Sequence, residues 1–128
     1  MTQSADAGVL IYAKHLALVA TFYERVLGAI TLHADAEHRV LQADGAQLVI
    51  HAIPAAYAAA VEIATPPVPR EEQAIKPFFT VADLAEAEQV VVETGGVIYG
   101  PIWPGPGMRV RNVCDPEGNI IHLRQRDA

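Results

Sequence analysis

The chain has almost no side chains suited to nucleophilic catalysis. Cys114 is its only cysteine, and no serine follows Ser4. A hydrolase of the Gly-x-Ser-x-Gly type is therefore excluded, because that motif needs a serine between two glycines. A single cysteine forms no intrachain disulfide, so we expect a reducing compartment and a cytoplasmic location. No histidine is adjacent to Cys114 in the sequence, which favours a semi-buried structural residue over a nucleophile.

Long apolar runs and an excess of basic residues are also missing. No run approaches the ~20 apolar residues of a membrane span, and residues 1–6 lack the basic start of a signal peptide. The formal net charge is −6, with 9 Lys and Arg against 15 Asp and Glu. This balance argues against nucleic acid and against a membrane surface as partners. An apolar fraction of 52% in 128 residues indicates one folded domain.

The sequence contains an internal repeat. His15-Leu16-Ala17 opens a segment that runs to Gly28, and Asp83-Leu84-Ala85 opens a similar one that runs to Gly96, so both offsets are 68 (83 − 15 and 96 − 28). Further along, residues 48–51 resemble residues 119–122 at an offset of 71 (122 − 51). A repeated unit of this length is usually one supersecondary module that buries its apolar face against its copy.

Apolar periodicity predicts the same order of elements in both halves. The expected elements are a strand at 9–13, a helix at 16–27 and strands at 30–33, 38–43 and 47–53, then a strand at 76–81, a helix at 84–94 and strands at 97–99, 108–113 and 119–124. A Pro-rich connection, residues 54–75, separates the halves and begins with a possible short helix at 55–60. The sequence thus predicts two βαβββ modules, about 8–53 and 76–124, in a single domain, 1–128.

A known family has these features. Phe22-Tyr23, Val26-Leu27-Gly28 and the segment Asp115-Pro116-Glu117-Gly118-Asn119, combined with the repeat, resemble the vicinal oxygen chelate superfamily. This superfamily includes glyoxalase I, extradiol dioxygenases, fosfomycin-modifying enzymes and bleomycin-resistance proteins. The resemblance covers about residues 8–124. It implies an α+β fold in which two βαβββ modules form a cupped mixed sheet, with the substrate and often a divalent metal in the cup, and often a homodimer.

The metal ligands implied by the resemblance are largely absent. They would come from the start of the first strand and from the fourth strand of each module, which places Gly8, His51, Lys76 and His122 at the ligand positions. Glycine has no ligand side chain, and a lysine ammonium is a cation without an acceptor. A glutamate is usual where His122 stands, and a facial triad needs a carboxylate. We expect no cofactor; if a divalent metal does bind, His51 and His122 are the expected ligands.

Other side chains are expected to line the same cup, because side chains alternate across a strand. The candidate ligand-binding residues are Tyr12, Lys76, Phe78, Trp103 and Arg124. Lys76 either pairs with a ligand anion or forms a salt bridge, for example with Glu72. Tyr12 either binds the ligand or fills the cup, and Arg124 lies near the rim. Trp103, in a Pro-rich connection, is either a lid over the cup or a residue buried at the sheet edge.

The histidines divide into two groups. His51 and His122 are candidate catalytic residues, as general bases near neutral pH; a metal-ligand role and a cup-lining role remain open. His33 and His38 flank a hairpin turn without a known ligand spacing, so we interpret them as surface residues. His15 stands at a helix start as a poor cap.

The function predicted from these observations is binding or transformation of a small organic molecule in a cup with a degenerate metal site. Such a protein is either a binding protein or a lyase or isomerase that uses a histidine base. The alternative is a metal-dependent lyase or dioxygenase with an atypical His-containing site. A third class is a dimeric scaffold whose cup is closed by side chains. The expected partners are a small-molecule ligand and a second copy of the chain.

Overall fold

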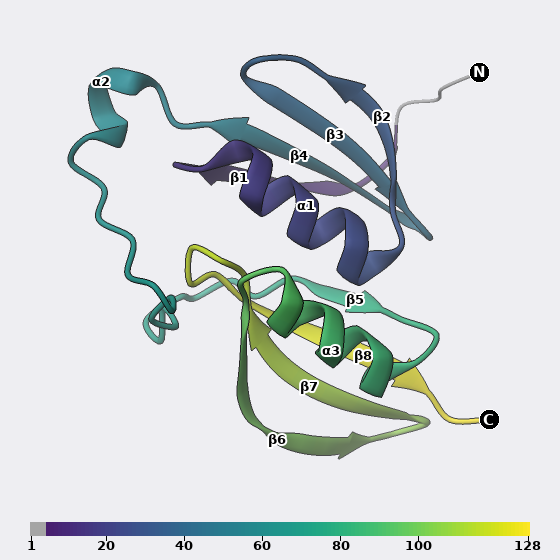
Figure 1. Cartoon of the computed structure of the whole chain (residues 1–128). Coiled ribbons are helices and arrows are strands. Elements are labelled where there is room, and N and C mark those ends of the chain that lie inside the picture. Colours follow the sequence, from purple (N-terminus) through teal and green to yellow (C-terminus); the bar gives the residue numbers. More distant parts are fainter. Residues whose placement is uncertain (1–4) are drawn as a thin grey trace.

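The computed structural model describes residues 5–128, in which the predicted order of elements is present twice (Figure 1). The expectation about a signal peptide rests mainly on residues 1–4, which lie outside the described residues. The elements are β1 (Gly8–Ala13), α1 (Leu16–Leu27), β2 (Ile30–Ala34), β3 (His38–Ala43), β4 (Ala46–Ala52), α2 (Ala55–Ala58), β5 (Phe78–Thr80), α3 (Leu84–Glu93), β6 (Val97–Gly105), β7 (Met108–Cys114) and β8 (Ile120–Arg126).

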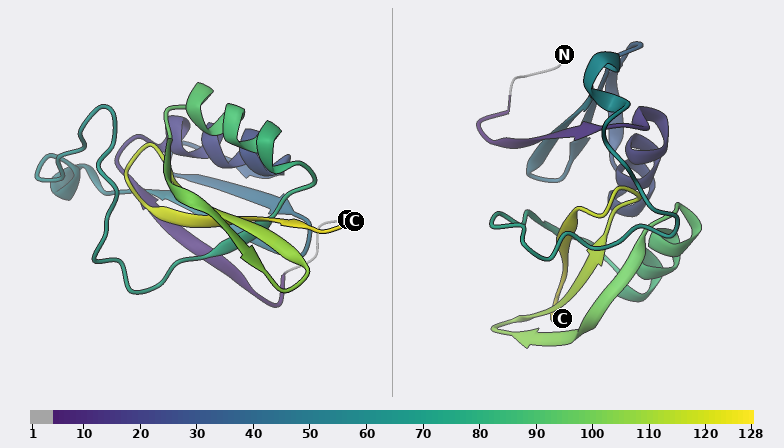
Figure 2. Two further views of the ribbon diagram at one scale, coloured as in Figure 1. Left: turned by 90° about the horizontal axis from the view of Figure 1, so that it is seen from below. Right: turned by 90° about the vertical axis from the view of Figure 1, so that its left-hand side faces the viewer.

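Each module forms a four-stranded mixed sheet. The strand order is β1-β4-β3-β2 in the first and β5-β8-β7-β6 in the second, with β1–β4 and β5–β8 parallel and the other pairs antiparallel. Figure 2 shows α1 and α3 on the same side of the molecule, with both sheets on the other side. The predicted α+β class with two βαβββ modules is confirmed, and each sheet has one helix-covered face and one helix-free face.

The core lies between the helices and the sheets and includes residues of both modules. Val19, Phe22 and Tyr23 of α1 are fully buried, as is Val91 of α3. Tyr23 also contacts the Phe79 ring of the second module, with 6.3 Å between centroids. The apolar spacing predicted from the sequence therefore marks the faces through which the two modules pack together.

The helix ends follow the expected local chemistry, with one exception. Gly28 ends α1 in the left-handed conformation, at φ 63°, and Asp83 caps α3 by accepting a hydrogen bond from the Glu86 N–H at 3.0 Å. His15 makes no side-chain cap at the start of α1. The carboxylate of Glu117, from the second module, accepts hydrogen bonds from the Lys14 and His15 N–H groups at 2.8 and 2.7 Å instead.

The turn between β7 and β8 holds the modules together. Asp115 is fully buried, and its carboxylate accepts hydrogen bonds from the Tyr23 hydroxyl, the Glu117 N–H and both nitrogens of Asn119. Burial raises the pKa of Asp115, although these hydrogen bonds oppose the shift. Burial and the neighbouring Asp115 raise the pKa of Tyr23 well above its usual value. The Asp-Pro-Glu-Gly-Asn segment of the second module is thus hydrogen-bonded to α1 of the first module.

One predicted connection is wrong. The Pro-rich residues around Trp103 do not form an irregular loop, because β6 continues to Gly105 and pairs Trp103 with Val110. An irregularity in the register between Ile98 and Ile102 accommodates Pro101, while Pro104 pairs with Arg109. Both prolines are tolerated because β6 is an edge strand. In the described part of the chain, no helix is long and apolar enough to cross a membrane.

Candidate functional site

The predicted site residues lie on the helix-free faces of the two sheets. Leu10 and Tyr12 of β1 are exposed while Val9 and Ile11 pack against the core. In the second sheet, Phe78 is exposed and Phe79 is buried. Because side chains alternate along a strand, the strand residues that the sequence assigned to the cup share the helix-free faces.

On the first sheet, three ring side chains form a row across the strands. His51 of β4 pairs with Tyr12 of β1 on one side and with His38 of β3 on the other. The ring centroids of Tyr12 and His51 are 5.1 Å apart, and those of His38 and His51 are 4.4 Å apart with an interplanar angle of 71°. His38 is partly exposed, as the sequence predicted, but its ring also contacts His51.

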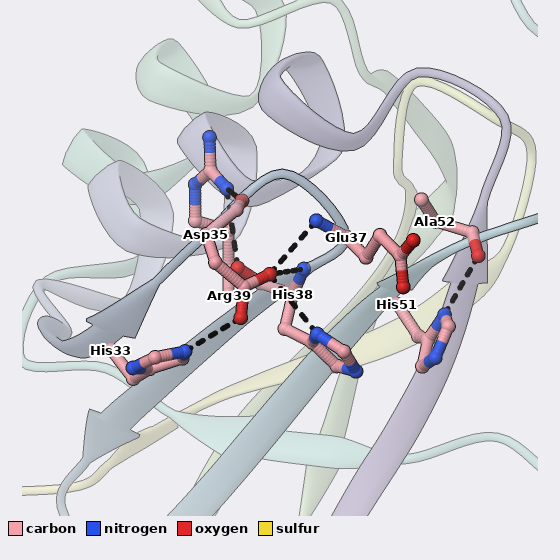
Figure 3. A network of polar contacts seen from close by, with 7 residues as sticks. All are labelled: His33, Asp35, Glu37, His38, Arg39, His51 and Ala52. Carbon is pink, nitrogen blue, oxygen red and sulfur yellow. Dashed lines mark hydrogen bonds and ion pairs between the residues drawn. The ribbon is translucent and has the colours of Figure 1, made fainter.

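A carboxylate at the end of this row orients His33 and His38 (Figure 3). Asp35 lies 2.7 Å from His33 Nε2 and 3.0 Å from His38 Nδ1, and it accepts the N–H groups of Glu37 and His38. The hydrogen bond with His33, followed by that from Glu37, lowers the pKa of Asp35 well below its usual range. His51 has its Nδ1 2.7 Å from the Ala52 carbonyl oxygen.

The second sheet presents cations and aromatic rings instead. One row across the sheet contains Trp103, Val110, Arg124 and Thr80. The next contains Asn112, His122 and Phe78. The guanidinium carbon of Arg124 lies 3.6 Å from the centroid of the Phe78 ring, a cation–π contact. Arg124 Nε and Asn112 Oδ1 are both buried, and neither atom has a hydrogen-bond partner among residues 5–128.

The charges on this face act on His122. Partial burial lowers the pKa of the imidazole, and the positive charges of Lys76 and Arg124 lower it further. Lys76 therefore lies close enough to His122 to influence it. None of the ion pairs within the described residues involves Lys76, so the alternative of a salt bridge with Glu72 is not seen.

The strand register corrects the predicted equivalence of His51 and His122. Phe78, which is equivalent to Leu10 by the 68-residue offset, pairs with His122, whereas Leu10 pairs with Val49. His51 is therefore displaced by two residues along its strand relative to His122. Two residues are one full period of side-chain alternation, so both histidines still lie on helix-free faces.

The ligand positions implied by the family resemblance do not fit a metal ion. A Cβ atom at Gly8 would lie 2.5 Å from the Gln47 carbonyl oxygen, so no side chain can be placed there without moving the backbone of β4. Lys76, at the corresponding position of the second module, carries a positive charge and has no acceptor for a metal ion. Within residues 5–128, no cluster of three or more His, Cys, Asp or Glu side chains is arranged to hold a metal.

Cavities lie between the modules. One of about 420 Å³ is lined by Phe78 and Thr80 of β5, by Ala46 of β4 and by Arg126. Another cavity, of about 600 Å³, lies beside the end of α1. Its lining includes Gln42 and Asp83 but none of the predicted site residues. No hydrogen bond or ring contact in the described chain joins the Tyr12–His51 group to the Phe78–His122 group.

Two further side chains clarify the chemistry. Cys114 is buried, and burial raises the pKa of its thiol to about 11, which disfavours the reactive thiolate. His38 was missed as a site candidate because the pairing of the strands at 38–43 and 47–53 was not predicted from the sequence. The turn Asp44-Gly45 was the available signal, since a two-residue hairpin loop fixes this register.

Comparison with known proteins gives a consistent fold. In sequence, the chain matches no protein-family model and no curated protein. A glyoxalase/bleomycin resistance protein/dioxygenase family enzyme from Burkholderia phytofirmans has a similar structure, with a TM-score of 0.70, 16% identity, and 96% of this chain and 99% of that chain covered.

Two resistance proteins are also similar. For a bleomycin resistance determinant encoded on transposon Tn5, the TM-score is 0.63 at 22% identity, covering 98% of this chain and 100% of that one. For a fosfomycin resistance protein from Listeria monocytogenes, it is 0.66 at 12% identity, covering 97% and 94%. The chain therefore has the fold of these glyoxalase/bleomycin-resistance/dioxygenase proteins, which is the fold that the sequence resemblance implied.

Proposed function

We propose that the protein binds a small organic molecule with an anionic group on the helix-free face of the second sheet, without the metal set implied by the resemblance. The observation that carries this proposal is the cluster formed by Arg124, His122 and Lys76. Arg124 has a buried Nε without a partner, and Lys76 and Arg124 both act on His122. A carboxylate or phosphonate oxygen would satisfy such donors.

The aromatic side chains beside these cations favour a ligand with a flat apolar part. Phe78 and Trp103 are each 54% exposed, although large apolar side chains are usually buried. The row that contains Trp103 also contains Arg124.

The similar proteins support a small-molecule role only in general terms. Two of them are resistance proteins whose names refer to bleomycin and fosfomycin. We further propose that the protein is a homodimer, because Leu10, Tyr12 and Ile30 leave apolar surface exposed on the first sheet. The molar mass in solution, measured by light scattering, tests this part of the proposal.

An enzymatic role is the second candidate. The lowered pKa of His122 keeps its imidazole mostly neutral near pH 7, where a neutral ring accepts a proton. A lyase or isomerase would use His122 as a general base beside an anionic substrate held by Arg124. Lost activity in His122→Gln with retained ligand affinity would distinguish this role from binding alone.

The single tryptophan provides a direct test, because Trp103 is the only one in the chain. We expect benzoate to change Trp103 fluorescence in a saturable way, and the neutral analogue benzamide to bind more weakly. Arg124→Met and Lys76→Met should each weaken benzoate binding about tenfold, since a charge-assisted hydrogen bond contributes about 1.5–3 kcal/mol.

A matched control variant is available in the same sheet. Arg109 alternates with Val110 on β7, so its side chain lies on the opposite face. Arg109→Met removes the same charge and should leave benzoate binding unchanged. Equal binding of benzoate and benzamide, or an equal loss in Arg109→Met, would contradict the proposal.

A further inference from the structure

We propose that His38 and His51 form a binding site for a divalent transition-metal ion, such as Zn²⁺ or Cu²⁺, on the helix-free face of the first sheet. This site is independent of the proposed anion site, which lies on the second sheet. It shares His51 with the ligand set implied by the family resemblance, but its second ligand, His38 of β3, lies outside that set.

The placement of the two rings carries the proposal. His38 and His51 are directly opposite each other on neighbouring antiparallel strands, and their ring centroids are 4.4 Å apart. A zinc–nitrogen bond is about 2.0–2.1 Å long, so one ion bridges two nitrogens that are up to about 4 Å apart. Each ring centroid lies about 1 Å beyond its ligating nitrogen, and so about 3 Å from a bound ion. Two centroids 4.4 Å apart are therefore within the span of one ion.

The hydrogen bonds of the rings decide which nitrogen is free. His51 Nδ1 lies 2.7 Å from the Ala52 carbonyl oxygen, which only accepts hydrogen bonds, so Nδ1 carries the proton. His38 Nδ1 lies 3.0 Å from the Asp35 carboxylate and carries its proton for the same reason. Each neutral ring therefore has its lone pair on Nε2. Histidine ligands in metal sites are held by the same kind of bond to a carbonyl or carboxylate.

The surroundings allow an ion to approach. Figure 3 shows the two rings side by side, with their second nitrogens pointing in the same direction, away from Asp35 and Ala52. Arg39 donates hydrogen bonds to the Asp35 and His38 carbonyl oxygens. It pairs with the buried Ile50, so it belongs to the neighbouring row that faces the core and not to the row of the two histidines. The negative charge of Asp35 favours a cation at His38.

Two protein ligands leave the remaining positions of the ion for water or for an oxygen of a bound molecule. The Tyr12 ring, 5.1 Å from His51, is a third side chain on the same row. Imidazole suits Zn²⁺, Ni²⁺ and Cu²⁺, and the affinity of a given site rises toward Cu²⁺. We therefore expect Cu²⁺ to bind more tightly than Zn²⁺.

The test adds Zn²⁺ alone to metal-free protein at about pH 8, above the usual imidazole pKa of about 6.5, and follows the histidine rings by NMR. We expect one ion per chain, with shifts of the His38 and His51 ring nitrogens and none at His15. Calorimetry on His38→Ala and His51→Ala should show loss of this binding, with His38→Asn as a second, polar variant. Asp35→Asn should weaken it about tenfold or more.

The matched control is His15→Ala, which removes an exposed histidine that lies near a carboxylate, Glu117, and should not change Zn²⁺ binding. Dispersed amide spectra establish that each variant is folded. Loss of binding in His122→Ala, retained binding in a folded His38→Ala, or ring shifts at only one of the two histidines would each overturn the proposal.

Discussion

The β3–β4 hairpin of the first module turns through Asp44 and Gly45, whereas the β7–β8 hairpin of the second module turns through residues 115–119. The longer turn reaches the other module, where Asp115 binds the Tyr23 hydroxyl and Glu117 caps α1. The longer turn of the second module thus forms the contact that joins the copies.

The helix-free faces of the two modules differ as well. The first presents His38, His51 and Tyr12 in one row, with the Asp35 carboxylate hydrogen-bonded to His38. The second presents Arg124 and His122 without a carboxylate partner among the ion pairs of residues 5–128. The two proposed sites, one on each module, would therefore bind ligands of opposite charge.

The largest effect on stability is expected at Asp115, in the turn between β7 and β8. Asp115→Ala removes the acceptor of four hydrogen bonds and leaves the buried Tyr23 hydroxyl without a partner, so we expect a loss of about 3–5 kcal/mol in the free energy of unfolding. The matched variant Asp44→Ala, in the shorter turn, should change stability by less than about 0.5 kcal/mol. Urea denaturation measures both; similar losses would contradict the asymmetry between the turns.

A smaller effect is expected from the cap that the second module provides. Glu117→Ala leaves the Lys14 and His15 N–H groups without their acceptor, which should lower stability by about 1.5–3 kcal/mol. The control is Glu93→Ala, because the Glu93–Arg25 ion pair is exposed and such pairs contribute about 0–1 kcal/mol. If both variants lose the same stability, the cap does not hold the modules together.

Equivalent positions at the start of the two modules should also respond differently. In Gly8→Ala, the new Cβ would lie 2.5 Å from the Gln47 carbonyl oxygen, and the strain should destabilise the protein by about 1–2 kcal/mol. Lys76→Ala, at the matching position, removes an exposed side chain and should change stability by less than about 0.5 kcal/mol. Thermal denaturation of the two variants provides the comparison.

The order of elements was predictable because the apolar spacing of α1 and the turn residues are local signals. The Asp83 cap and the Gly28 helix end were also predictable, since both depend on neighbours in the chain. The path of β6 was not, because prolines usually end a strand and the pairing of Trp103 with Val110 overrides that preference.

The candidate site was predictable only in part. Alternation placed Tyr12 and Phe78 on the correct faces, but the displacement between His51 and His122 depends on strand register. The repeat in the sequence does not record a shift of two residues, since such a shift preserves alternation. The role of Glu117 depends on the contact between modules, which the residues around it do not reveal.

The smallest effect concerns the charges on the second face. Burial, Lys76 and Arg124 lower the pKa of His122, so Lys76→Met should raise that pKa toward the usual value of about 6.5. Arg109→Met, on the opposite face of the sheet, should not change it. NMR titration of the imidazole measures both variants, and an unchanged pKa in Lys76→Met would remove Lys76 from the anion site.

The same shift gives stability a pH dependence of known sign. As pH falls through about 6.5, the unfolded chain binds a proton at His122 before the folded chain does. The contribution of His122 to stability is therefore present above this pH and is lost as pH falls toward the lowered pKa of the folded state. The loss should be smaller in Lys76→Met, because the folded imidazole then accepts the proton more readily. Denaturant unfolding between about pH 5 and 8 measures it, and an equal loss in wild type and variant would show that the lysine does not act on this face.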